Sequence, residues 1–242
     1  MLIDNHVHIG PFKDGMMFEP EDVAANMLRI GVTRWIYFST AFPCVADNYI
    51  EWYHECVQRM DVASSGRGIP FLWMNGKMLR NSDCYYDSMF RGIKIHEGCD
   101  VLSDRERECA FALAAENNVP LVIHTGEQAH CKAGQYEKLI AGYENVLVIL
   151  AHGRPLKQAL SLLRKYPKVM LDSAFMSLEQ MKAVATADFI DRIFFGSDYP
   201  VQQYFYPRHD LMTMWRTHYE MMKSIFGKHT VERLIIDNLY SQ

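Results

Sequence analysis

The sequence predicts a single-domain (β/α)₈ barrel, the TIM-barrel architecture, over residues 1–242. Eight short apolar runs alternate with longer amphipathic stretches of helical period, the pattern of repeated strand and helix units. The length agrees with the roughly 250 residues of a typical barrel domain. No internal repeat, low-complexity tract or Pro/Ser-rich linker divides the chain. An open, doubly wound sheet is the alternative architecture.

The expected strands are the apolar runs, and the expected helices are the amphipathic stretches between them. The strands are residues 2–8, 33–39, 69–74, 92–96, 119–125, 146–152, 169–173 and 193–197. The helices are residues 21–30, 48–62, 104–117, 135–143, 155–166 and 178–186. Pro155 suits a first helical turn, Ser103 or Asp104 can cap a helix, and Gly31 follows one where a left-handed residue is favoured. Only the link 75–91 lacks a convincing helix. Because right-handed crossovers place every helix outside the strands, such units close into a barrel.

Composition and charge exclude several classes of protein. Hydrophobic residues make up 49% and charged residues 22% of the chain, values typical of a globular domain with a sizeable core. A net charge of −4, without any run of more than two Lys or Arg residues, offers no surface for nucleic acid. No stretch reaches the ~18 apolar residues of a membrane span, and the first ten residues show no signal-peptide pattern. We therefore expect a cytoplasmic protein that binds no membrane. Six scattered cysteines without a Cys-x-x-Cys pair indicate free thiols.

Histidines gather at the expected ends of strands. Five of the ten histidines lie there, and Asp198 follows the eighth strand in the same way. These five are His6, His8, His96, His124 and His152. In a barrel the C-terminal ends of the strands form one face, which carries the active site in nearly all such enzymes. We therefore expect these side chains to converge although they are far apart in the sequence.

His6 and His8 form a candidate metal site. They lie two residues apart on one strand, so both side chains point the same way, with Asp4 one pleat below them. Neutral imidazole is a common zinc ligand, and His124 and Asp198 can supply further ligands and leave one position open for water. Asp4 is expected to orient a ligating imidazole and to fix its tautomer. An isolated His-x-His more often reflects chance or surface packing, but the other strand-end histidines favour the metal site.

Five segments resemble the successive signatures of the amidohydrolase superfamily, specifically its amidohydrolase 2 branch. They are Ile3-Asp4-Asn5-His6-Val7-His8, Gly92-Ile93-Lys94-Ile95-His96, Ile123-His124-Thr125-Gly126, Leu150-Ala151-His152-Gly153 and Gly196-Ser197-Asp198-Tyr199-Pro200. The resemblance runs from Asp4 to the closing Asn238-Leu239-Tyr240. It implies a barrel of the metal-dependent hydrolase type, whose members hydrolyse amides, esters and lactones. Some members decarboxylate or hydrate unsaturated carboxylic acids without a redox cofactor.

The resemblance also implies roles for individual residues. The residues that match metal-ligand positions are His6, His8, His124 and Asp198. His152 matches a residue near the metal-bound water that acts as base or orienting group. Two positions depart from the pattern, since Glu97 stands where many relatives have proline and Arg154 stands where a second glycine is common. These departures leave the loop shapes and the substrate open.

Lys94 shares one face of the fourth strand with Gly92 and His96. Three roles are open for it: binding a substrate carboxylate, forming a structural ion pair with Asp4 or Glu97, or, as in related superfamily members, carrying a carbamate that bridges two metals. For His96 the alternatives are substrate contact, a hydrogen-bonded core position and metal ligation.

The loop after the eighth strand is the other candidate for substrate contact. Residues 199–209 combine Tyr204, Phe205 and Tyr206 with Arg208 and His209, a composition that suits a wall against a small planar or acidic substrate. Ordinary packing is the alternative. Arg154, Arg208 and Lys132 are the loop cations that could bind a carboxylate.

The predicted function is metal-dependent hydrolysis of an amide, ester or lactone bond in a small, carboxylate-bearing substrate. One divalent ion per chain, expected to be Zn²⁺, activates water, and a carbamate on Lys94 would make the site binuclear. His152 or Asp198 takes up a proton and returns it to the leaving group. The alternative on the same site is non-oxidative decarboxylation or hydration of a small unsaturated or aromatic carboxylic acid. A metal-binding sensor or scaffold without turnover is a third hypothesis. The expected partner is the small-molecule substrate, and a homodimer is one option for assembly.

Overall fold

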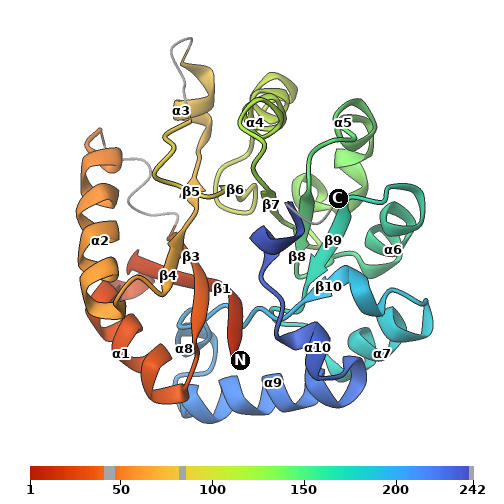
Figure 1. The fold of residues 1–242 in the computed structure, drawn as a ribbon. Coiled ribbons are helices and arrows are strands. Elements are labelled where there is room, and N and C mark those ends of the chain that lie inside the picture. Colours follow the sequence, from red (N-terminus) through yellow and green to blue (C-terminus); the bar gives the residue numbers. More distant parts are fainter. Residues whose placement is uncertain (41–46, 82–85, 240–242) are drawn as a thin grey trace.

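The computed structural model describes residues 1–40, 47–81 and 86–239, which form the predicted (β/α)₈ barrel (Figure 1). Its two hydrogen-bonded sheets have the strand orders β2-β1-β3-β4 and β5-β6-β7-β8-β9-β10. The strands are β1 Ile3–Pro11, β2 Met17–Phe18, β3 Arg34–Ser39, β4 Gly68–Pro70, β5 Leu72–Trp73, β6 Ile93–Ile95, β7 Leu121–His124, β8 Val148–Ala151, β9 Val169–Asp172 and β10 Ile193–Phe194. The short β2 pairs with β1 antiparallel, and the other strand pairs are parallel.

The two sheets join into one closed barrel along two seams. At the first seam β4 and β5 are separated only by Phe71, whose backbone amide donates to a β3 carbonyl at 2.9 Å. The next amide, that of Leu72, donates to the Gly92 carbonyl on the opposite side at 2.9 Å. At the second seam the Asn5 amide of β1 donates to the carbonyl of Phe195, just after β10, at 2.9 Å. With β4 and β5 as one interrupted strand, eight parallel strands complete the ring.

The helices lie outside the ring of strands (Figure 1). They are α1 Pro20–Ile30, α2 Tyr49–Ser64, α3 Gly76–Arg80, α4 Asp104–Glu116, α5 Glu137–Gly142, α6 Leu156–Lys165, α7 Leu178–Thr186, α8 Gln202–Phe205, α9 Leu211–Phe226 and α10 Lys228–Val231. Each of the six predicted helices overlaps an observed one, and the link 75–91 holds only the five-residue α3 among its described residues. The last three helices were not predicted, and α8 interrupts a stretch that was expected to be a loop. None of the described helices is both long and apolar enough to cross a bilayer.

Local sequence signals fix several helix ends. Gly31 closes α1 with a φ of 97°, a left-handed conformation that glycine adopts without steric cost. Ser103 begins α4 with a capping box, because its hydroxyl accepts from the Glu106 amide while the Glu106 carboxylate accepts from the Ser103 amide. Pro155 immediately precedes α6 rather than occupying its first turn. The capping predictions for Ser103 and Gly31 are therefore confirmed.

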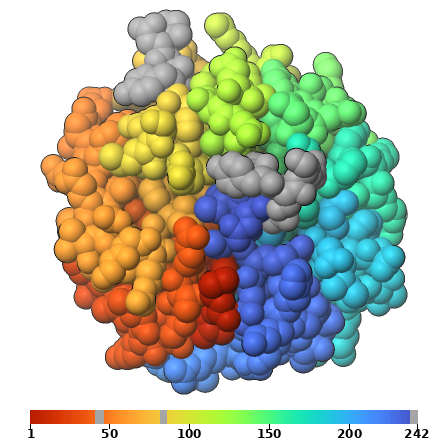
Figure 2. Space-filling model, viewed as in Figure 1, coloured from red at the N-terminus to blue at the C-terminus, as the bar shows by residue number. Residues whose placement is uncertain are grey.

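Residues 232–239, near the C-terminus, cover the N-terminal ends of the strands. The Ile235 amide donates to the side-chain oxygen of Asn5 at 2.9 Å, and the Arg233 guanidinium donates to the carbonyl of Ile193, the first residue of β10, at 3.1 Å. Figure 2 shows this dark blue segment beside the red N-terminal residues. The strand ends that carry the histidines lie at the opposite end of the barrel.

A buried ion pair ties α4 to the segment after β6. The Glu97 carboxylate is fully buried and accepts two hydrogen bonds from the Arg107 guanidinium, at 2.8 and 2.7 Å. The Tyr136 hydroxyl and the Leu102 amide donate to the same carboxylate. These four donors compensate for the loss of water around the charge.

Replacing Arg107 with Leu is expected to lower the free energy of unfolding by about 3–5 kcal/mol, because the Glu97 carboxylate stays buried and loses its cation. Urea denaturation measures the change. The control is Arg59→Leu, which breaks exposed ion pairs with Glu19 and Glu21 and should cost less than about 1 kcal/mol. Equal losses in the two variants would contradict a structural role for the buried pair.

Candidate functional site

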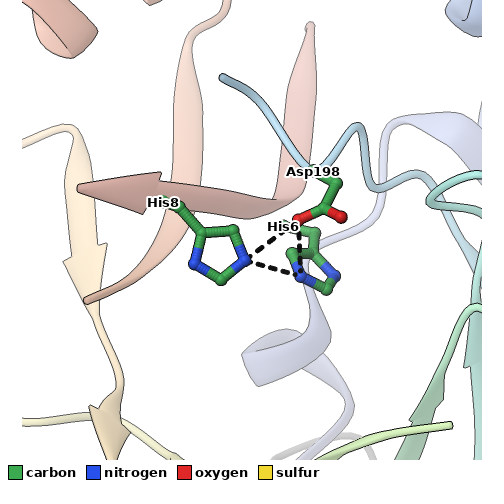
Figure 3. Close-up of side chains that lie close together, drawn as sticks. All are labelled: His6, His8 and Asp198. Carbon is green, nitrogen blue, oxygen red and sulfur yellow. Dashed lines mark hydrogen bonds and ion pairs between the residues drawn. The ribbon is translucent and has the colours of Figure 1, made fainter. Parts of the chain in front are cut away.

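Three of the predicted metal ligands converge at the C-terminal ends of the strands (Figure 3). His6 and His8 come from β1, and Asp198 comes from the segment after β10. The two Nε2 atoms lie 3.1 Å apart, and Asp198 Oδ1 lies 3.3 Å from that of His6 and 2.9 Å from that of His8. All three side chains are buried. The barrel therefore brings residues from both ends of the chain to one point.

The other ring nitrogens fix the protons of both histidines. His6 Nδ1 lies 2.7 Å from Asp172 Oδ2, and His8 Nδ1 lies 3.1 Å from the backbone carbonyl of Ser39. Both oxygens accept hydrogen bonds, so each Nδ1 carries the proton and each neutral ring presents an Nε2 lone pair. Burial and the charge of Lys94 lower the pKa of His6, which keeps its ring neutral.

Asp198 completes a set of three acceptors. Burial by itself raises the pKa of Asp198, but the His6 and His8 rings hold this pKa below its ordinary value, so the carboxylate is ionised. The two Nε2 atoms and the carboxylate oxygen then face one another, and a positive charge placed between them, a metal ion or a proton, stabilises the arrangement. Tetrahedral zinc with bonds of about 2.0–2.1 Å separates neighbouring ligand atoms by roughly 3.3 Å, close to the three distances observed. The donor set therefore fits a divalent cation.

Asp172, at the end of β9, is a functional residue that the sequence analysis missed. Its Oδ2 accepts from the His6 ring, and its Oδ1 accepts from the backbone amides of His152 (3.2 Å) and Ala174 (3.0 Å). Burial raises the pKa of Asp172, but the neighbouring His6 ring, which donates a hydrogen bond to it, brings this pKa to about 2. Such a carboxylate holds a ligating ring in one tautomer and one orientation. The available signal was an acid in an apolar strand, where a buried charge requires a partner.

Asp4 is placed differently from its prediction. Its carboxylate accepts from the Ser197 hydroxyl and the Trp215 indole, both at 2.6 Å, and from the backbone amides of Ser197 and His6. It contacts no imidazole, so the orienting role predicted for Asp4 belongs to Asp172. The reason is an irregularity in β1, whose register against β3 shifts between Asp4 and Val7. Such a bulge breaks the alternation of side chains on which the prediction rested.

His152 lies beside the three acceptors as a candidate base. Its ring centroid is 5.4 Å from that of His6. Its Nδ1 lies 2.9 Å from the Ala174 carbonyl, so the neutral ring carries its proton there and leaves Nε2 as an acceptor. Burial lowers the pKa of His152 to about 4, which keeps the ring neutral at pH 7. His152 and Asp198 have φ angles of 66° and 62°, a left-handed conformation that is uncommon for residues other than glycine.

His124, the fourth predicted ligand, lies outside the group of three whose donor atoms converge. Its ring stacks on His96 with the centroids 3.6 Å apart, and His96 stacks on Trp73 at 5.1 Å. Within the described part of the chain, Nδ1 of both histidines is buried and has no hydrogen-bond partner. Burial holds the pKa of both rings well below its ordinary value. Metal ligation by His124 and substrate contact by His96 stay predictions.

Lys94 is fully buried, and its ammonium lies 5.0 Å from the centroid of the Phe38 ring. Its Nζ has no hydrogen-bond partner among residues 1–40, 47–81 and 86–239. The structural ion pair considered for Lys94 is not found, because Asp4 and Glu97 are both engaged by other donors. Burial lowers the pKa of Lys94 to about 8.

One cavity of about 860 Å³ is lined by the five strand-end histidines, Lys94 and Asp198, and its exposed rim includes Phe205 and Tyr206. Arg154 also lines the cavity, and its guanidinium donates to the Phe175 carbonyl at 3.0 Å. Arg208, the other arginine predicted to bind a carboxylate, is exposed and does not line the cavity. It lies on a loop, and the path of a loop is not set by the alternation that places strand residues.

The family of the chain follows from its match to a family model. The amidohydrolase model matches residues 7–228, which include all of the site residues described above except Asp4 and His6. The chain belongs to the amidohydrolase family. The resemblance inferred from the five motifs is therefore confirmed. The comparison with curated proteins finds no match.

Solved structures share the fold of this amidohydrolase at low sequence identity. Amidohydrolase 2 from Bifidobacterium longum subsp. infantis has a TM-score of 0.65 and 18% identity, covering 93% of this chain and 92% of that chain. IDCase from Metarhizium anisopliae has a TM-score of 0.63 and 14% identity, covering 99% and 95%. A probable 2-pyrone-4,6-dicarboxylic acid hydrolase from Acinetobacter baumannii has a TM-score of 0.62 and 11% identity, covering 94% and 99%. These likenesses confirm the barrel over nearly the whole chain.

In this amidohydrolase, Asp172→Asn is expected to lower the affinity for zinc by roughly 10–100-fold, because the His6 ring loses its charged partner while the side-chain size is kept. Competition with a fluorescent zinc chelator measures the affinity. Glu179→Gln, on the exposed side of α7, is the control and should leave the affinity unchanged. If Asp172→Asn binds zinc as tightly as the control, Asp172 does not support the site.

Proposed function

We propose that this amidohydrolase is a metal-dependent hydrolase that cleaves an amide, ester or lactone bond in a small, carboxylate-bearing substrate. One observation carries the proposal, the convergence of His6 Nε2, His8 Nε2 and Asp198 Oδ1 within 3.3 Å of one another. These acceptors line a cavity large enough for a small molecule, at the end of the barrel where active sites lie. The proposed ion is Zn²⁺, one per chain, because two imidazoles and a carboxylate suit it.

The proposed mechanism divides the work between a divalent ion and the side chains around it. When bound, the ion supplies Lewis acidity toward a carbonyl oxygen and lowers the pKa of water to roughly 7. His6, His8 and Asp198 hold the ion, and Asp172 keeps the His6 lone pair aimed at it. His152 accepts a proton at Nε2 and returns it to the leaving group, a task worth roughly 10²–10⁴ in rate. Asp198 is the alternative base.

Non-oxidative decarboxylation or hydration of a small carboxylic acid is the second candidate. The buried ammonium of Lys94, which has no hydrogen-bond partner in the described part of the chain, favours an acidic substrate for either reaction. Proteins of the same fold include the probable 2-pyrone-4,6-dicarboxylic acid hydrolase, solved with citric acid bound, and a 4-oxalomesaconate hydratase. A panel of lactones, esters and aryl carboxylic acids separates the candidates, because hydrolysis releases acid and decarboxylation releases CO₂.

His6→Ala and His8→Ala are expected to lose zinc and turnover together, because each removes one donor from a site with few ligands. The purified wild-type protein should contain about one zinc per chain. Elemental analysis measures the metal, and the substrate panel measures turnover. Absence of metal from the wild type, together with failure to bind zinc on reconstitution, would refute the proposed centre.

His152→Asn is expected to keep near-normal zinc content and to lower kcat by roughly 10²–10⁴, the loss expected for a positioned acid or base. Metal analysis and steady-state kinetics on the same sample test both parts. Loss of zinc as complete as in His6→Ala would make His152 a ligand and move the base to Asp198. Unchanged kcat would remove His152 from the mechanism.

A further inference from the structure

Lys94 is a buried cation that has no hydrogen-bond partner among the residues that the structure describes. Its side chain is 0% exposed and lines the cavity, and no described residue forms a hydrogen bond with its Nζ. The two carboxylates whose charges raise the pKa of Lys94 are Asp172 and Asp198, and both already interact with other groups. Asp172 accepts from His6 and from two backbone amides, and Asp198 faces the two imidazoles of β1. An unpaired ammonium in a protein interior is costly, so this position calls for an anion supplied by a ligand.

The ammonium lies close enough to the three acceptors to act on the same small molecule. Its Nζ is 5.0 Å from the centroid of the Phe38 ring, and this centroid is 5.1 Å from that of His6. The ammonium is therefore no more than about 10 Å from the His6 ring. A substrate that reaches both must carry its anionic group only a few bonds from the bond that is cleaved.

The outer end of the cavity has a different character. Phe205 is 56% and Tyr206 is 43% exposed, and Phe175 contacts both, with ring centroids at 5.6 and 6.5 Å. Large aromatic side chains exposed together at the rim of a cavity are typical of a binding surface. The cavity thus has an aromatic rim, formed by Phe175, Phe205 and Tyr206, and a buried cation deeper in.

We propose that Lys94 determines the specificity of this site for acids, and that its ammonium binds the substrate carboxylate at the inner end of the cavity while the aromatic rim holds the apolar part. This assignment rests on the proposed function for its link to catalysis. It replaces the alternative in which Lys94 carries a carbamate and bridges two metals. The carboxylate supplies the missing counter-ion, so binding it relieves the cost of the buried charge.

The test compares benzoate with benzamide, which has nearly the same shape and no charge. Isothermal titration into the zinc-loaded protein should show that Lys94→Met weakens benzoate binding by roughly 10–100-fold, as expected for loss of a hydrogen bond between charged groups. Benzamide binding should change less than about threefold, and zinc content should stay normal. The control is Lys13→Met, which removes an exposed ammonium that also lines the cavity and should leave benzoate binding within about threefold.

Several results would overturn the inference. Wild-type benzoate affinity in Lys94→Met would do so, and loss of zinc in Lys94→Met would assign Lys94 to the metal. If Lys94→Met does not fold, the test is made on metal-free wild-type protein, which should still bind benzoate more tightly than benzamide. Equal binding of the two probes would contradict the assignment.

The same titrations separate this inference from the proposed function. Benzoate binding that depends on Lys94, without turnover of any ester, lactone or amide, would refute the hydrolase and leave the inference standing. Hydrolysis with benzoate binding that is independent of Lys94 would refute the inference alone.

Discussion

The site depends on one constraint, the convergence of two imidazole nitrogens and one carboxylate oxygen on a single buried point. His6 Nε2, His8 Nε2 and Asp198 Oδ1 lie within 3.3 Å of one another in a buried position, where lone pairs and charge repel. The acceptors beside each Nδ1, Asp172 and the Ser39 carbonyl, prevent either ring from relieving this repulsion by changing its tautomer. The surrounding structure therefore concentrates negative charge at one point, and a cation bound there neutralises it.

The fold maintains this arrangement through Asp4. β1 and the segment after β10 come from opposite ends of the chain, and backbone hydrogen bonds join them at Asn5 and at His8. The Asp4 carboxylate adds bonds from Ser197 and from Trp215 of α9, just beside the point where Asp198 leaves the barrel. Burial raises the pKa of Asp4 to about 6 despite these donors. Asp4 was predicted to orient a ligating imidazole, but its hydrogen bonds instead join β1 to the segment after β10 and so help to close the barrel.

Sequence reasoning located the site because strand ends in a barrel share one face, so His6, His8 and Asp198 could be grouped without knowing any loop. The sequence did not reveal the groups that hold the two ligating rings, which are Asp172 for His6 and the Ser39 carbonyl for His8. Asp172 lies in an apolar strand where no spacing marks it, and the bulge that turns Asp4 away leaves no trace in the alternation of β1. Arg208 was misplaced for a different reason, because loop paths depend on packing that no local periodicity records.

The cavity combines an aromatic rim with an inner wall that carries His6, His8 and Asp198, and the proposed function depends on this inner wall. The most direct measurement is a crystal structure of the zinc-loaded protein with anomalous diffraction recorded at the zinc edge. We expect one peak about 2.0–2.2 Å from His6 Nε2, His8 Nε2 and an Asp198 oxygen, and the same map shows whether His124 joins them. No zinc peak at these three atoms, or zinc bound only elsewhere in the molecule, would contradict the proposed metal site.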